Sequence, residues 1–220
     1  MNVCNFKIVI SSYKTSYKIT AKKLIESLVE NNNFPKSQIL LVVGGYENKL
    51  ETNLLDVQTI YVDHNSYDHT GLIEIIEGNH QSEFWFSTHD TCIAGDNFIN
   101  FIKNFNYKKD YTSMTDMGWL NMGMFHKNYL KRNSEYILSM KNCSKIRAIL
   151  SERVFTRLED YDYYIKDSEC IRSLENQNIY KDNKKRNVLY FKDIDLYKYQ
   201  SYEALNIMKP NFTESRMDLM

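Results

Sequence analysis

Residues 39–43 read ILLVV, an unbroken run of apolar side chains. A strand with one face in water alternates apolar and polar residues, whereas a strand covered on both faces can be apolar along its whole length. Pro35 and Ser37 precede the run and Gly44-Gly45 follows it, so turn-forming residues mark both of its ends. The stretch therefore predicts a central strand of a parallel sheet.

Strand-like and helix-like segments alternate around this run through the first 105 residues. Further strands are predicted at residues 6–11 (FKIVIS), 59–63 (TIYVD) and 83–88 (EFWFST), and helices at residues 20–31, 70–77 and 96–104. Gly78 ends the second of these helices, and Asp96 is the expected cap of the third. The alternation predicts an α/β fold with a mainly parallel central sheet flanked by helices.

The second half predicts a mixed α+β arrangement. Short strands are expected at residues 111–115, 120–125 and 188–191, and helices at residues 128–141 and 144–158. No internal repeat and no long linker divides the chain, and 220 residues fit one large domain. We therefore expect a single domain over residues 1–220, with residues 201–220 as a C-terminal tail.

The composition narrows the class of ligand. Lys and Arg total 28 and Asp and Glu total 28, so the chain has no global basic field that would attract nucleic acid. The four cysteines are widely spaced, with no CxxC pair, which favours reduced thiols over disulfides or a zinc site. A small charged ligand in a local pocket fits this composition better than a nucleic acid.

The same sequence predicts where the protein acts. The first residues have neither the apolar stretch nor the cleavage site of a secretory signal, and no run approaches the roughly 18 apolar residues of a membrane span. We therefore expect a cytoplasmic protein without a transmembrane segment.

The strand at residues 83–88 ends in His89-Asp90-Thr91, and this end carries the main functional signal. Open α/β sheets bind ligands beyond the carboxyl ends of their strands, where a carboxylate can share Mg²⁺ with phosphate oxygens. Such a metal makes a diphosphate a better leaving group. The alternative is that Asp90 caps a loop or a helix, and we expect His89 to be a structural neighbour of Asp90.

These features resemble the glycosyltransferases of the GT-A fold, which transfer a sugar from a nucleotide diphosphate donor. The resemblance rests on Ser11-Ser12-Tyr13 after the first strand, on Asp90, and on the later Gly123-Met124-Phe125 and acidic segments. The chain looks most similar to small transferases of bacteria and large DNA viruses, and a virus-encoded enzyme would act in the host cytoplasm. The resemblance implies a nucleotide-binding half at residues 1–105 and an acceptor and catalytic half at residues 106–200.

In this family the acidic strand end usually has the sequence DxD, whereas in this chain it is His89-Asp90-Thr91. The resemblance therefore implies Mn²⁺ or Mg²⁺ at a single carboxylate, Asp90, with more coordination sites left to water and phosphate. Nucleotide contacts are implied for six residues: Ser11, Ser12, Tyr13, Lys14, Asp63 and Lys198. Lys198 is the expected diphosphate contact, and Lys192 and Arg186 are its competitors.

The resemblance also implies residues for the sugar and for catalysis. Trp119, Asn121 and Gly123 would line the donor and acceptor sugars, although Trp119 could instead be a core residue. Glu159 or Asp160 would remove the proton from the acceptor hydroxyl, although a run of acids is also typical of a solvated helix start.

The resulting hypothesis is a hexosyl- or deoxyhexosyltransferase that uses a nucleotide-diphosphate sugar, a glycan or protein-linked glycan acceptor, and inversion at the anomeric carbon. The first strand is followed by Ser11-Ser12-Tyr13-Lys14, without glycine. Nucleotidyltransferases, dinucleotide-binding dehydrogenases and methyltransferases need a glycine-rich turn at this point, so these classes fit less well. The alternative hypothesis is a non-catalytic nucleotide-sugar-binding or interaction module on the same fold.

Overall fold

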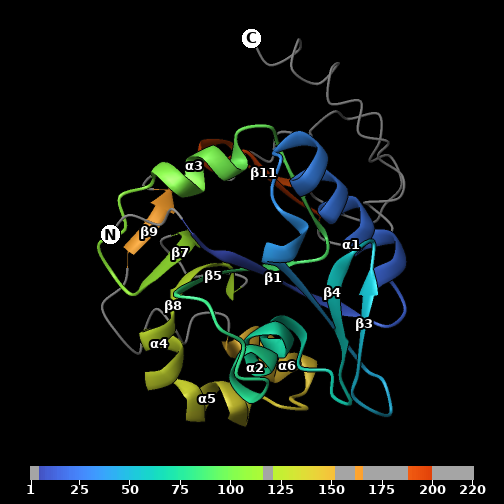
Figure 1. Cartoon of the computed structure of the whole chain (residues 1–220). Helices are drawn as coiled ribbons and strands as arrows, with labels where there is room; N and C mark the ends of the chain where they lie inside the picture. The colour runs from blue at the N-terminus through green and yellow to red at the C-terminus, as the bar shows by residue number, and fades with distance from the viewer. Residues whose placement is uncertain (1–4, 116–120, 152–161, 166–187, 200–220) are drawn as a thin grey trace, which may run out of the picture.

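The computed structural model describes residues 5–115, 121–151, 162–165 and 188–199. It confirms the predicted α/β class: helices cover both faces of one mixed sheet, and a smaller antiparallel sheet lies beside it (Figure 1). In the described residues, no helix is long and apolar enough to cross a membrane.

The centre of the large sheet is parallel. Its four parallel strands, in the order β4-β2-β1-β5, are β4 (Val57–Tyr61), β2 (Ile39–Gly44), β1 (Lys7–Tyr13) and β5 (Phe84–His89). Every residue of β2 is buried, as the run ILLVV predicts for a strand covered on both faces.

The outer strands make the large sheet mixed. At one edge, β3 (Leu50–Leu54) pairs antiparallel with β4, and beyond β5 lie β8 (Gly123–His126), β7 (Tyr111–Thr115) and β9 (Asp162–Ile165). The small sheet consists of β10 (Val188–Phe191), β11 (Leu196–Tyr199) and β6 (Cys92–Ala94), all antiparallel.

The hairpin between β3 and β4 was not predicted. Its two connecting residues, Leu55 and Asp56, have φ angles of 58° and 60°, which is the left-handed conformation that a tight two-residue hairpin turn requires. Such turns usually carry Asn-Gly or Asp-Gly, so the pair Leu-Asp gives no turn signal in the sequence.

The helices form two layers. Helices α1 (Tyr17–Glu26) and α3 (Phe98–Asn104) lie on one face of the sheet, and α2 (Thr70–Glu77), α4 (Lys127–Arg132), α5 (Ser134–Ser139) and α6 (Lys145–Ser151) lie on the other (Figure 1). A single π-helical turn, Ser27–Asn31, extends α1, and 3-10 turns occur at Lys36–Gln38, Tyr67–His69 (η3) and Lys192–Ile194.

Two helix predictions need correction. The predicted helix over residues 128–141 is divided at Asn133, which separates α4 from α5. The N-cap position of α3 is Asn97 rather than Asp96, and the Asn97 backbone N–H donates to the Asp195 carboxylate at 3.0 Å. The first N–H groups within the helix have other acceptors, since Phe98 donates to the Gly95 carbonyl oxygen and Ile99 to Asn32 Oδ1.

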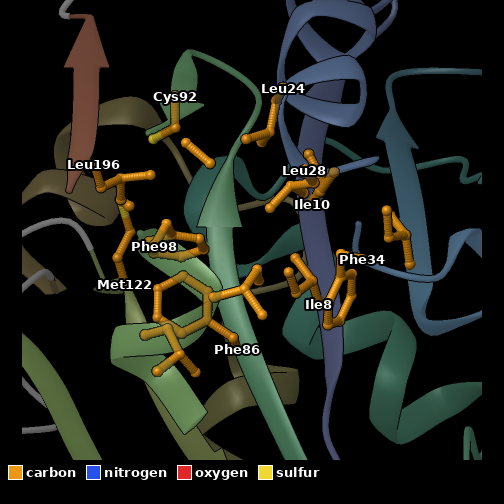
Figure 2. Packing of buried hydrophobic residues seen from close by; sticks show 14 of the residues in the cluster. Ile8, Ile10, Leu24, Leu28, Phe34, Phe86, Cys92, Phe98, Met122 and Leu196 are labelled. Carbon is orange, nitrogen blue, oxygen red and sulfur yellow. The ribbon is translucent and has the colours of Figure 1, made fainter. Parts of the chain in front are cut away.

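Each face of the sheet has its own apolar core. Along β1 the side chains alternate, so that Ile8 and Ile10 belong to the core beneath α1 and α3 while Val9 belongs to the core beneath α2. Figure 2 shows the first core, where Phe86 from β5 and Phe98 from α3 pack with their ring centroids 5.3 Å apart. Because the central strands are buried on both faces, a shift of their register would expose apolar side chains.

We expect Phe86→Ala to lower the free energy of unfolding by about 3–5 kcal/mol, because truncating a fully buried ring leaves a cavity in a packed core. Urea unfolding followed by far-UV circular dichroism measures the change. Leu50→Ala, on the exposed edge strand β3, is the control and should change stability by no more than about 0.5 kcal/mol. Equal losses for both variants would contradict the assignment of this core.

Candidate functional site

A cavity of about 490 Å³ opens at the carboxyl edge of the parallel strands. The order β4-β2-β1-β5 reverses direction at β1, and ligands of open α/β sheets bind beyond the strand ends at such a reversal. Five segments line the cavity: Ser11, Ser12 and Tyr13 at the end of β1; Asn65, Tyr67 and Asp68 before α2; His89, Asp90 and Thr91 after β5; Lys145 of α6; and Lys198 of β11.

The structure brings together five of the residues that the sequence predicts for the site, namely Ser11, Ser12, Tyr13, Asp90 and Lys198. Lys198 comes from the small sheet, where its partner on β6 is Cys92. Lys14 and Asp63 are exposed and do not line the cavity.

Other predicted site residues fall elsewhere. Trp119, Glu159, Asp160 and Arg186 lie outside the described residues, and only the backbone of Lys192 is described. Asn121 is fully buried, with its Nδ2 atom 3.4 Å from His69 Nε2, and does not line the cavity. The arrangement gives no support to its predicted contact with a sugar.

Gly123 serves strand packing. Its φ angle is 150°, and a Cβ atom added there would lie 2.2 Å from the Thr112 carbonyl oxygen of β7. A side chain at this position would separate β7 from β8. Gly123 is also buried and away from the cavity lining, so its predicted sugar contact is not supported by this arrangement.

Three hydroxyl groups surround the Asp90 carboxylate. Oδ2 accepts hydrogen bonds from Ser12 Oγ at 2.5 Å, from Ser16 Oγ at 3.5 Å, and from Thr20 Oγ1. The Asp90 backbone N–H donates to the Ser11 carbonyl oxygen at 3.1 Å. Asp90 therefore ties the turn after β5 to the end of β1 and to the first turn of α1, in agreement with the loop-capping alternative.

A divalent cation finds no prepared set of ligands at this site. In the part of the chain that the structure describes, no group of three His, Cys, Asp or Glu side chains is placed to bind a metal. The hydrogen bonds of Asp90 all fall on Oδ2, so a cation would share one carboxylate with water and ligand oxygens. The described side chains alone do not fit a divalent cation, and Mn²⁺ or Mg²⁺ at Asp90 stays a prediction.

Lys198 is a buried cation at the cavity. Its side chain is 7% exposed, and Nζ donates to Thr91 Oγ1 and to the Tyr199 carbonyl oxygen at 3.1 Å. Among the described residues, no salt bridge joins it to a carboxylate. A buried charge is unfavourable unless it is paired, so an anionic ligand in this cavity would supply the missing partner.

Asp68 and His89 form a close side-chain pair that the sequence analysis did not identify. His89 precedes Asp90 in the sequence, but its Nε2 atom lies 3.1 Å from Asp68 Oδ1, so its side chain contacts Asp68. Desolvation raises the pKa of Asp68 to about 6, and the positive charge of Lys198 acts in the opposite direction. Asp68 lies within η3, several residues after the end of β4, so strand-end reasoning selects Asp63 rather than Asp68.

Tyr13 forms an aromatic edge of the cavity. Its side chain is 36% exposed, and its ring packs on Gly45, where an added Cβ atom would lie 2.4 Å from Tyr13 Cε2. Gly45 has a φ of 88°, so both the conformation and the contact require glycine. The accessible ring offers a face on which a planar base could stack.

Comparisons with known proteins give only distant likenesses. No protein-family model and no curated protein matches the sequence. A putative protein (Aq1419) from Aquifex aeolicus VF5 is 15% identical, with a TM-score of 0.44 over 72% of this chain and 85% of that chain. TarS 1-349 of S. aureus is 12% identical, with a TM-score of 0.36 over 59% of this chain and 49% of that chain. At these scores, neither likeness identifies an activity.

We expect Thr20→Val to destabilise the fold by about 1.5–3 kcal/mol, because a hydrogen bond to the Asp90 carboxylate is lost while the shape of the side chain is kept. Thermal unfolding measures the effect. Thr15→Val, in the exposed turn before α1, is the matched control and should stay within about 0.5 kcal/mol of the native chain. An unchanged melting temperature for Thr20→Val would show that Asp90 does not depend on this hydroxyl.

Asp68→Asn should stabilise the protein at pH 8 and leave it near native stability at pH 4. The pKa of Asp68 is higher in the folded chain than its ordinary value of 3.8. Ionising Asp68 therefore opposes folding, with an effect that begins above pH 4 and is complete above about pH 6. The gain at pH 8 is at most about 3 kcal/mol, reduced by the 20% exposure of the side chain.

Urea unfolding at the two pH values measures this difference. Asp56→Asn, an exposed carboxylate in the β3–β4 turn, is the matched control and should show no such pH dependence. A loss of stability for Asp68→Asn at pH 8 would mean that the carboxylate is stabilised in the fold, contrary to the desolvation that we describe.

Proposed function

We propose that the chain is a glycosyltransferase that binds a nucleotide-diphosphate sugar in the cavity at the ends of β1 and β5 and transfers the sugar to a hydroxyl acceptor. The observation that carries the proposal is the buried Lys198 ammonium group, which lines this cavity and has no carboxylate partner among the described residues. A diphosphate supplies the negative charge and the acceptor oxygens that such a lysine requires.

The dimensions and the lining of the cavity support a ligand of this class. About 490 Å³ lies within the range of small-molecule pockets. Both Tyr13 and Lys198 line the cavity, so Tyr13 offers a face for the base and Lys198 offers a charge for the phosphates. The two groups would hold the two chemically different ends of a nucleotide diphosphate.

Lys198 would act on the leaving group. As the acceptor oxygen bonds to the anomeric carbon, the bond from that carbon to the phosphate oxygen breaks, and negative charge accumulates on the diphosphate. A fixed ammonium group beside that oxygen stabilises the charge more in the transition state than in the bound donor. Removal of the acceptor proton by Glu159 or Asp160 stays a prediction, because both lie outside the described residues.

The alternative function is a module that binds a nucleotide sugar without transferring it. The commitment of Asp90 Oδ2 to three hydroxyl groups favours this alternative, because a carboxylate with a structural role is less available to a metal. Release of free nucleotide from a bound nucleotide sugar separates the two functions, since only the enzyme catalyses it.

A thermal-shift screen tests the proposal with UDP-glucose, GDP-mannose, TDP-glucose and CMP-N-acetylneuraminate, each with and without Mn²⁺. We expect at least one diphosphate sugar to raise the melting temperature, because a ligand that binds only the folded state stabilises it. Dependence of that shift on Mn²⁺ would support a cation at Asp90. No shift with UDP-glucose, GDP-mannose or TDP-glucose would refute the proposed function, because CMP-N-acetylneuraminate carries only one phosphate.

Lys198→Met should weaken binding of the active nucleotide sugar about 10- to 100-fold, which corresponds to the loss of about 1.5–3 kcal/mol from a charged hydrogen bond. Isothermal titration calorimetry measures the affinity. Lys36→Met is the control and should bind as the native chain does. Lys36 is exposed and lies just before β2, at the amino ends of the parallel strands and away from the cavity. Equal affinity of the Lys198→Met and native chains would remove Lys198 from the site.

A further inference from the structure

Asp68 is presented to the cavity by a turn that is hydrogen-bonded to β1. It lies at the centre of η3, and its carbonyl oxygen accepts a hydrogen bond from Ser11 Oγ at 3.3 Å. The same Ser11 oxygen accepts from the Gly71 backbone N–H at 3.0 Å. A Cβ atom at Gly71 would lie 2.9 Å from Ser11 Oγ, so glycine permits this close approach of α2 to β1.

The residue before Asp68 adopts an unusual conformation. Tyr67 has a φ angle of 50°, in a region that is unfavourable for a bulky side chain. Such backbone strain persists only where the surroundings impose it, and it is concentrated at functional sites. Tyr67 also lines the cavity, so the strained residue and the carboxylate that follows it face the same space.

The two described acids of the cavity differ in their availability. Asp90 Oδ2 accepts hydrogen bonds from three hydroxyl groups and ties together the ends of three segments. Asp68 instead faces His89, and burial opposes its ionised form. A carboxylate that binds a proton more readily than usual is suited to accept one from a hydroxyl group.

We infer that Asp68 is the general base of this site: it takes the proton of the acceptor hydroxyl while the acceptor oxygen attacks the anomeric carbon of the bound donor. The inference rests on the proposed function and assigns it a proton acceptor. One bond forms between the acceptor oxygen and the anomeric carbon, and the bond from that carbon to the diphosphate oxygen breaks. Its electron pair stays on the diphosphate, and the proton on Asp68 is later lost to water.

Charged and titratable groups from several elements surround Asp68. They are His89 after β5, Lys198 of β11, Lys145 of α6, Cys143 before α6, and Asp90, which lines the same cavity. Lys198 and a protonated His89 both favour the carboxylate form, whereas burial favours the carboxylic acid. The balance gives a pKa of about 6, so Asp68 is largely ionised and able to act as a base at pH 7–8.

The test measures nucleotide release with water as the acceptor, for the full chain and the nucleotide sugar that gives the largest shift in the four-sugar screen. For the native chain, we expect the rate to fall about tenfold per pH unit below about pH 6, because the base must be ionised. Asp68→Asn should lose at least about 100-fold in rate while its donor Kd stays within about threefold of the native value. Asp56→Asn is the matched control and should keep the native rate.

Each other outcome has a distinct meaning. Release by Asp68→Asn at a near-native rate, or a native rate that does not change between pH 5 and 8, would overturn the assignment of Asp68. A 100-fold loss in Glu159→Gln or Asp160→Asn, with a native rate in Asp68→Asn, would place the base where the sequence predicted it. Donor binding without release by the native chain would overturn the assignment and favour a binding module. Failure of all four sugars to bind would overturn the proposed function itself.

A second variant covers the case in which Asp68→Asn does not fold. Asp68→Ser keeps a small polar side chain at the same position and should show the same loss of rate with retained donor binding. The donor Kd is the readout that separates loss of the base from loss of the fold, because a merely structural role would weaken binding together with the rate.

Discussion

The parallel pairing of β1 with β2 on one side and β5 on the other is the interaction on which the rest of the structure depends. Both ladders are in register along most of β1, and its side chains alternate between two apolar cores. A strand held on both edges and both faces cannot shift without exposing those cores. Its carboxyl end is therefore a fixed point from which the neighbouring turns are positioned.

Two adjacent serines at that end position the two acids of the cavity. Ser12 donates to the Asp90 carboxylate, while Ser11 links the turn that carries Asp68 to β1. Both hydroxyl groups were expected to contact a nucleotide directly, yet each is already hydrogen-bonded within the chain. These hydrogen bonds orient the acids, and a site whose polar groups are oriented before ligand binding requires less reorganisation. Both serines also line the cavity, so their contact with a nucleotide stays a prediction.

The electrostatic character of the cavity comes from segments that lie far apart in the sequence. Lys198 reaches it only because β11 pairs with β6, directly after the turn that contains Asp90. Lys145 arrives from α6, on the opposite face of the sheet from α1. A buried lysine, a desolvated carboxylate and a hydroxyl-bound carboxylate thus share one space, and such a set of groups is typical of ligand-binding sites.

Local patterns in the sequence determined the α/β class, the parallel centre of the sheet and several elements to the residue, among them Thr70–Glu77, Tyr111–Thr115 and Val188–Phe191. Hydrophobic periodicity and turn residues are local features that span a few positions, so they can be recognised in a single sequence. Only the tertiary structure decided that Asp68 and Lys198 share the cavity while Asp63 and Gly123 do not. Which residues share the cavity depends on strand order and long-range pairing. The hydrogen bond between Ser12 and Asp90, for example, joins residues that are far apart in the sequence and that no local pattern relates.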